Sequence, residues 1–165
     1  MKYKTIFFDL DGTITDSAPG IMNSIKYALE KNHLPMLSEE QLRSFIGPPL
    51  RGQFCKVCGL ADEESARMVE DYREYYRDKG IFENNVYDGV IEMLEKLRKK
   101  GFRLAIATSK PEKYAKIIID HFHLTKYFAC VAGMEMDGGR GTKAQVITYA
   151  LEKNDITDKS KVLMI

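Results

Sequence analysis

Apolar residues in this chain form short runs that alternate with longer stretches of helical spacing. Residues 4–10 are rich in Ile and Phe, which is typical of a buried strand, and the run ends in an acidic turn. After Gly89 the alternation is regular, with helices predicted at 90–100, 112–122 and 143–153 and strands at 103–107, 128–132 and 162–165. This α/β order predicts a Rossmann-like, mainly parallel sheet, whose ligands bind beyond the carboxyl ends of its strands.

The stretch between the first strand and the rest of the sheet has a different pattern. Apolar residues at helical spacing predict a helix over 17–32, and Ser38 opens a capping box. Further helices are predicted at 50–58 and 62–79, with no strand among them. We therefore expect an inserted α-helical cap domain at 15–85 and a catalytic core made of 1–14 and 86–165.

Charge and terminal composition restrict the partners that we expect. The chain has 25 Lys and Arg against 24 Asp and Glu, so its weak net field does not favour a nucleic-acid partner. The apolar run near the N-terminus is too short for a signal peptide or a membrane span. We expect a cytoplasmic protein that binds neither nucleic acid nor membrane.

The cysteines give little sign of a disulfide framework or of zinc. There are three, which is an odd number, and reduced thiols are the expectation. Cys55 and Cys58 have the spacing of zinc ligands, but the chain has no second Cys pair. A structural metal is therefore not expected there.

Asp9 and Asp11 are the first candidate catalytic residues. They flank Leu10 directly after the first strand, so two carboxylates are held near each other. Neighbouring carboxylates tend to take different protonation states, which lets one attack while the other donates a proton. The alternative is an ordinary Asp-Gly turn, because Asp and Gly are common turn residues.

Thr108 and Ser109 form the second candidate position. They follow the apolar run 104–107 and precede a predicted helix, where hydroxyls and free amides suit a phosphate group. The alternative is that one of them merely caps the helix.

Lys143 is the third candidate. It shares an i, i+3, i+4, i+7 stripe with Val146, Ile147 and Ala150, so it lies on the face of its helix that meets the sheet. A cation in the first turn opposes the helix dipole, and its side chain is aimed toward the predicted ligand site. A carboxylate or phosphate is the natural counterion, while the alternative is a lysine that extends into solvent.

The sequence resembles the haloacid dehalogenase superfamily, in particular its phosphatases with a helical cap. Asp9-Leu10-Asp11-Gly12-Thr13 matches the first motif of that superfamily, Thr108 the second and Lys143 the third. The run 46–50, which contains Gly47-Pro48-Pro49, is similar to the cap loop of phosphoglycolate phosphatase-like and 5'-nucleotidase-like members.

The resemblance implies a Mg²⁺-dependent phosphatase that hydrolyses a small phosphate ester, such as phosphoglycolate or a nucleoside monophosphate. Asp9 would be the nucleophile that forms an aspartyl-phosphate, and Asp11 the acid and base. Both would bind Mg²⁺, Asp11 through its carbonyl oxygen. The phosphate ligands would be Gly12, Thr13, Thr108, Ser109 and Lys143. Dehalogenases of the superfamily lack the second aspartate, so Asp11 favours phosphoryl transfer.

The chain departs from the pattern at its end. The fourth motif of the superfamily is an acidic loop that would follow the strand at 162–165, and nothing follows Ile165. We therefore expect an incomplete core, weaker Mg²⁺ binding, and self-association through an exposed terminal strand. Two alternatives remain open: a shortened and catalytically silent chain, and a phosphomutase of the same fold.

One residue of the predicted cap is a candidate for substrate selection. Arg51 lies beside the Gly-Pro-Pro loop, where a guanidinium group would suit an anionic substrate tail. A plain surface role is the alternative for this arginine.

Overall fold

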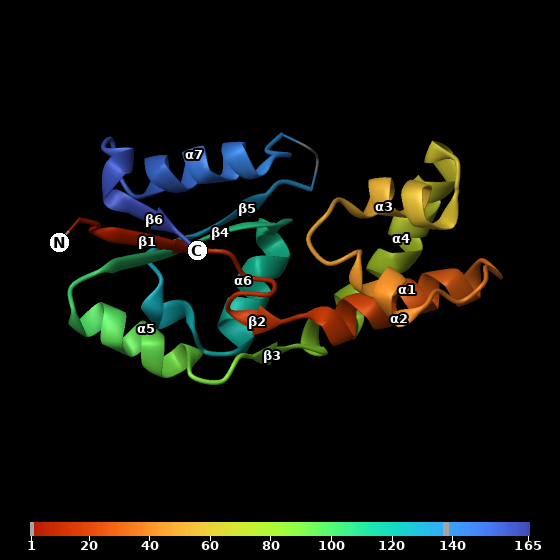
Figure 1. Cartoon of the computed structure of the whole chain (residues 1–165), viewed down its shortest axis with the longest axis horizontal. Coiled ribbons are helices and arrows are strands. Elements are labelled where there is room, and N and C mark those ends of the chain that lie inside the picture. The colour runs from red at the N-terminus through yellow and green to blue at the C-terminus, as the bar shows by residue number, and fades with distance from the viewer. Residues whose placement is uncertain (1, 137–138) are drawn as a thin grey trace. The chain divides into compact units, whose positions relative to one another are not determined.

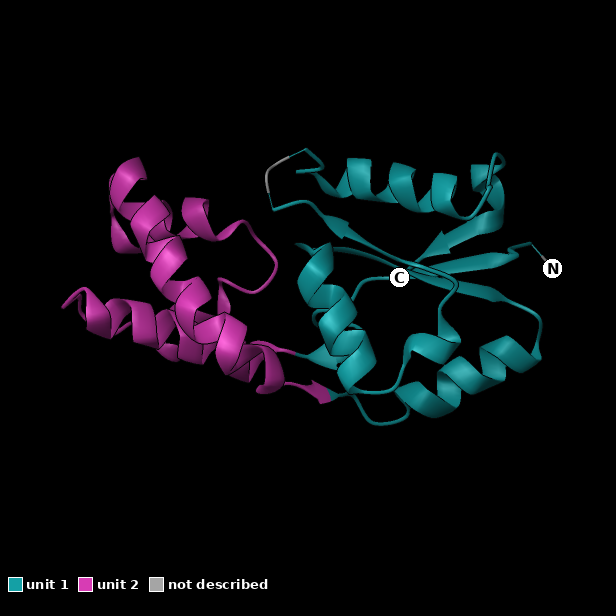
Figure 2. Cartoon of the chain, turned by 180° about the vertical axis from the view of Figure 1, so that it is seen from behind, with its two compact units in different colours: residues 1–16, 86–165 teal, residues 17–85 magenta. Residues whose placement is uncertain are grey.

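The computed structural model describes residues 2–136 and 139–165. The chain divides into two compact units, which Figure 2 shows in teal and magenta. Unit 1 consists of Met1–Asp16 and Val86–Ile165, and unit 2 of Ser17–Asn85. The chain thus leaves unit 1 after Asp16 and returns to it at Val86.

A parallel sheet forms the centre of unit 1. Its strands are β1 (Thr5–Phe8), β4 (Arg103–Pro111), β5 (Val131–Met134) and β6 (Val162–Met164), in the order β5-β4-β1-β6 (Figure 1). Every pairing in this sheet is parallel, with Thr5 opposite Arg103 on one side and Val162 on the other. All four residues of β1 are buried, as expected for a central strand covered on both faces. The predicted parallel α/β core is confirmed.

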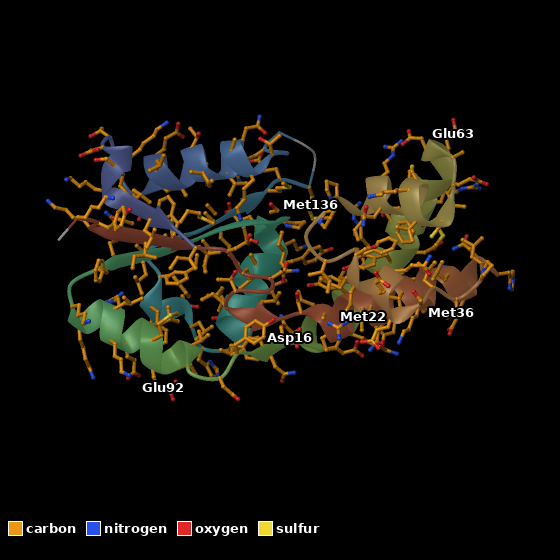
Figure 3. The ribbon with its side chains drawn as sticks, viewed as in Figure 1. Asp16, Met22, Met36, Glu63, Glu92 and Met136 are labelled. Carbon is orange, nitrogen blue, oxygen red and sulfur yellow. The ribbon has the colours of Figure 1, made fainter. Side chains whose placement is uncertain are left out.

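Helices of unit 1 cover the two faces of the sheet. In Figure 1, α7 (Lys143–Lys153) lies on one face, and α5 (Val90–Lys99) and α6 (Glu112–His121) lie on the other. On α5, Glu92 points away from the sheet in Figure 3, whereas Val90 and Leu94 are buried. The described part of unit 1 also contains the 3₁₀ turns η2 (Thr125–Tyr127) and η3 (Lys159–Lys161).

Small residues bring α7 close to the sheet. Its buried residues share one core cluster with strand residues on the same face, namely Phe7, Ala105, Ala107, Ala132, Val146, Ala150 and Leu151. Full burial of a side chain the size of Phe7 stabilises the fold by about 1.5–3 kcal/mol relative to exposure. The first turn of α7 lies near the carboxyl end of β4, because Lys143 Nζ donates a hydrogen bond to the Ala107 carbonyl oxygen.

The structure differs from the sequence prediction mainly at strand ends. β4 continues beyond Ala107 to Pro111, which pairs with Met134 of β5 after a register shift. β5 begins at Val131 instead of residue 128, and it follows the 3₁₀ turn η2 (Thr125–Tyr127). The segment 15–85 was expected to lack strands, but its ends contribute to β2 (Thr15–Asp16) and β3 (Asn85–Val86), which form a two-stranded sheet.

Unit 2 is helical. It contains α1 (Ala18–Lys31), α2 (Glu39–Arg43), α3 (Leu50–Cys58), α4 (Asp62–Asp78) and the 3₁₀ turn η1 (Gly80–Phe82). The predicted capping box is confirmed, since Ser38 Oγ accepts from Gln41 N and Gln41 Oε1 accepts from Ser38 N. Across residues 2–136 and 139–165, the structure has no helix that is both long and apolar enough to span a membrane.

Candidate active site

A tight turn after β1 holds the two candidate aspartates. The Leu10 carbonyl oxygen accepts hydrogen bonds from the amides of Thr13, Ile14 and Thr15, and the Leu10 side chain is fully buried. Gly12 has φ +77°, a conformation that glycine adopts without steric cost. Burial of Leu10 therefore fixes the backbone between the two aspartates, at the carboxyl end of the central strand.

The structure brings Asp9 and Lys143 together from opposite ends of the sequence. Lys143 Nζ lies 2.5 Å from Asp9 Oδ2 and donates a second hydrogen bond, of 2.8 Å, to the Ala107 carbonyl oxygen. The other oxygen, Asp9 Oδ1, accepts from the Leu10 amide at 2.7 Å. Both side chains are about one-third exposed, at 32% for Lys143 and 33% for Asp9. The ammonium group therefore meets a carboxylate that solvent still reaches.

A second capping box places Lys143. Thr142 is the N-cap of α7, its Oγ1 accepts from the Gln145 amide, and Gln145 Oε1 accepts from the Thr142 amide. The box fixes where the helix begins, so that Lys143 is its first residue. Sequence reasoning had placed this lysine correctly at the helix start and on the face toward the sheet.

The threonine and serine that follow the apolar part of β4 lie within the strand and do not cap a helix. Thr108 is buried, and its Oγ1 accepts a hydrogen bond of 3.2 Å from the Lys110 amide. Ser109 is half-buried. The N-cap of α6 is instead Pro111, so the helix-cap alternative for Thr108 and Ser109 is wrong.

Lys110 is a site residue to which sequence reasoning gave no role. Its Nζ lies 2.9 Å from Asp11 Oδ2, and the two side chains are only 6% and 15% exposed. Within the described residues, the other oxygen, Asp11 Oδ1, is buried without a hydrogen-bond partner. Thr108 and Lys110 are two apart and share one face of a continuing strand, but the apolar run that predicted this strand ends at Ala107.

The remaining candidates lie in different surroundings. Gly12 is exposed and Thr13 is half-buried in the turn after β1. Arg51 belongs to α3 of unit 2, where its Nε donates a 2.7 Å hydrogen bond to Asp62 Oδ1 and its Nη2 pairs with Oδ2. The guanidinium of Arg51 is thus engaged by a carboxylate, and its role toward a substrate stays a prediction.

The donor set suits a magnesium ion better than a softer metal. In the part of the chain that the structure describes, no group of three or more His, Cys, Asp or Glu residues could hold a metal. Magnesium commonly uses one or two protein carboxylates and takes its other oxygens from water and substrate phosphate. Asp9 supplies one carboxylate, which is about one-third exposed, and the backbone carbonyl oxygen of Asp11 is a second hard oxygen donor. The residues present therefore fit a magnesium site that a phosphate ester would complete.

Known proteins resemble this chain over nearly all of its length. The family of haloacid dehalogenase-like hydrolases matches residues 6–165. A 5'-nucleotidase of Pseudomonas aeruginosa is 38% identical over 94% of this chain and 71% of its own length. A phosphoglycolate phosphatase of Vibrio parahaemolyticus is 29% identical over 98% of this chain and 74% of its own length. The chain covers only half of another relative, the tyrosine-protein kinase PtkA of Mycobacterium tuberculosis, at 38% identity over 88% of this chain.

A solved structure supports the same relationship. The crystal structure of a predicted phosphatase from Clostridium acetobutylicum has a TM-score of 0.91 and 41% identity, and the match covers 99% of this chain and 76% of the other. The chain belongs to the haloacid dehalogenase-like hydrolases, and its phosphatase relatives support a phosphoric monoester hydrolase.

Proposed function

We propose that this protein is a Mg²⁺-dependent phosphatase that hydrolyses a small phosphorylated metabolite through an aspartyl-phosphate on Asp9. The observation that carries the proposal is the pair of ion pairs at the carboxyl ends of β1 and β4. Asp9 is bound to Lys143, and Asp11, two residues along, is bound to Lys110. Two carboxylates and two ammonium groups at one edge of a parallel sheet suit a phosphoryl group, whose oxygens are anionic and whose phosphorus is electrophilic.

The first step is attack by Asp9. A carboxylate oxygen of Asp9 forms a bond to phosphorus while the bond from phosphorus to the ester oxygen breaks. The ester oxygen leaves with a proton from Asp11. Lys143 stays beside the Asp9 carboxylate and offsets negative charge on the transferred oxygens, and bound Mg²⁺ would supply further charge neutralisation there.

The second step returns the enzyme to its starting state. Asp11, now ionised, takes a proton from water, and the water oxygen attacks the phosphorus of the aspartyl-phosphate. The bond from phosphorus to the Asp9 oxygen breaks, which releases inorganic phosphate. Division of one difficult displacement into two gives each step a positioned nucleophile.

The substrate class follows from the relatives and from unit 2. One curated relative is a 5'-nucleotidase and another a phosphoglycolate phosphatase, so a nucleoside monophosphate and a phosphoglycolate-like ester are the two proposed substrates. We propose that unit 2, helical and inserted after the Asp9 turn, is a cap domain that selects between them. The cytoplasm is the proposed location.

Phosphate release tests the proposal. The purified chain is assayed with Mg²⁺ on an aryl phosphate, phosphoglycolate and nucleoside monophosphates, in parallel with Asp9→Asn. Asp88→Asn is the matched control, because Asp88 is an exposed aspartate of unit 1 outside the site. We expect the parent and Asp88→Asn to release phosphate and Asp9→Asn to release none above background. Parent-level activity in Asp9→Asn would end the proposal.

A further inference from the structure

The ion pair between Lys110 and Asp11 is much more buried than the pair between Lys143 and Asp9. The side chains of Lys110 and Asp11 are 6% and 15% exposed, against 32% and 33% in the other pair. The two ammonium groups therefore serve different carboxylates in different surroundings. Lys143 pairs with Asp9, the proposed nucleophile, which solvent reaches, whereas Lys110 pairs with the more buried Asp11, the proposed acid.

The structure fixes Lys110 tightly. The Lys110 amide donates a 3.2 Å hydrogen bond to Thr108 Oγ1, within the part of β4 where its register with β5 shifts. On the other side, the Lys110 carbonyl oxygen packs against Gly133 of β5, where a Cβ would lie 2.6 Å from that oxygen. No side chain fits between the two strands at this point, so β4 and β5 hold the backbone of Lys110 in place.

Stability alone does not explain a buried lysine at this position. Removal of an ammonium group from water is costly, and replacement of a buried ion pair by apolar residues is often neutral or stabilising. What the pair does provide is orientation: Asp11 Oδ2 is held by Lys110, and Asp11 Oδ1 is buried without a partner among the described residues. Lys110 thus occupies one oxygen of the Asp11 carboxyl group and leaves the other, Oδ1, for a group that enters the site.

We propose that Lys110 is a positioning residue for Asp11, and that it leaves Oδ1 as the oxygen that passes the proton to the leaving group. The inference rests on the proposed function, since it assigns a task to the acid of that reaction. Lys110 acts through Asp11 and does not hold the transferred phosphoryl group, which is the task of Lys143. The loss of Lys110 therefore slows the step in which the ester oxygen departs.

Leaving groups of different basicity test this assignment. An aryloxide leaves with little help from an acid, whereas an alkoxide needs the proton, and general acids contribute about 10²–10⁴-fold to such steps. We measure kcat/KM, which reports phosphoryl transfer to Asp9, for an aryl and an alkyl phosphate. Lys110→Met is expected to lower the value for the alkyl ester at least about tenfold more than the value for the aryl ester. Lys113→Met, at an exposed position on α6, is the matched control and should change neither value.

A double-mutant cycle with Asp11→Asn separates action through Asp11 from independent action. With the aryl ester, Asp11→Asn should retain measurable activity, and the addition of Lys110→Met should cost nothing further. The same loss in both backgrounds, or an equal loss with both esters, would overturn the inference. If Lys110→Met alone does not fold, as judged by circular dichroism, Asp11→Asn is compared with the double variant, which lacks both charges. This comparison still shows whether Lys110 acts only through Asp11.

The failure of the inference and the failure of the proposed function are distinguishable. Asp11→Asn with parent activity on the alkyl ester would refute the role of Asp11 itself, and with it the proposed function. A selective loss in Asp11→Asn that is absent from Lys110→Met would refute only the role given to Lys110.

Discussion

Replacement of Lys143 by methionine should abolish most activity and leave the stability of the fold nearly unchanged. Methionine retains much of the apolar side chain and removes the ammonium group, which lies 2.5 Å from Asp9 Oδ2 and 2.8 Å from the Ala107 carbonyl oxygen. The Coulomb energy between Lys143 and Asp9 is large when the loss of hydration of the two charges is left out. Two unit charges at that separation interact by about 7 kcal/mol at an effective dielectric constant of about 20.

The net effect on folding is much smaller. Both side chains are about one-third exposed, and ion pairs that water reaches contribute only about 0–1 kcal/mol. Removal of a cation from the first turn of α7 also relieves an unfavourable interaction with the helix dipole, by about 0.3–1 kcal/mol. We therefore expect Lys143→Met to change the free energy of unfolding by less than about 1 kcal/mol.

The effect on catalysis should be much larger. Charge on the transferred phosphoryl oxygens is offset in the transition state, and the loss of one preorganised donor of this kind costs about 10²–10³-fold in kcat, or about 3–4 kcal/mol. The measurements are phosphate release at saturating substrate and urea unfolding of the same preparation. Lys153→Met, in the last turn of the same helix, is the control. A fall of less than about tenfold in a folded Lys143→Met protein would refute the role given to Lys143.

Two further predictions concern unit 2. A Cβ at Gly20 would lie 1.9 Å from the Gly80 carbonyl oxygen, so Gly20→Ala should lower the free energy of unfolding by at least about 1–3 kcal/mol. Gly52 lies on α3 with open space around it, so Gly52→Ala should raise the free energy of unfolding by about 0.5–1 kcal/mol. Equal urea midpoints for the two variants would contradict this prediction. Burial alone would raise the pKa of Asp71, but the hydrogen bond from Lys31 helps to hold that pKa below its ordinary value. Asp71 therefore stabilises the fold above its unfolded pKa of about 3.9 and loses this effect as the pH falls, so Lys31→Met should weaken the fall of the urea midpoint between pH 7 and about pH 3, and an unchanged fall would count against it.

Much of the fold could be predicted because the hydrophobic periodicity is strong. The bounds of α3 and α7 match the prediction to the residue. A capping box lies at the N-terminus of α2, as predicted, and another lies at the N-terminus of α7. The strand ends could not be predicted in the same way. Continuation of β4 to Pro111 depends on pairing with Met134, a residue far along the chain, and β2 and β3 are too short to produce a periodic pattern.

The residues of the candidate site also differ in whether a local pattern or tertiary pairing places them. Asp9 and Asp11 are placed by a local turn, and Lys143 by a stripe in which Val146 and Ala150 are fully buried, so local patterns located all three. No role was predicted for Lys110, because its position in the site depends on the extension of β4 through pairing with β5.

The most direct test of the account is to trap the phosphoryl group. The parent chain is mixed with Mg²⁺ and an aryl phosphate, quenched in acid within the first turnover and digested, and the peptides are analysed by mass spectrometry. We predict a single phosphoryl group on the peptide that contains Asp9, assigned by fragmentation to Asp9 and absent from Asp9→Asn. Phosphate release by the parent with the label on another residue, or with no labelled peptide at any quench time, would contradict the account.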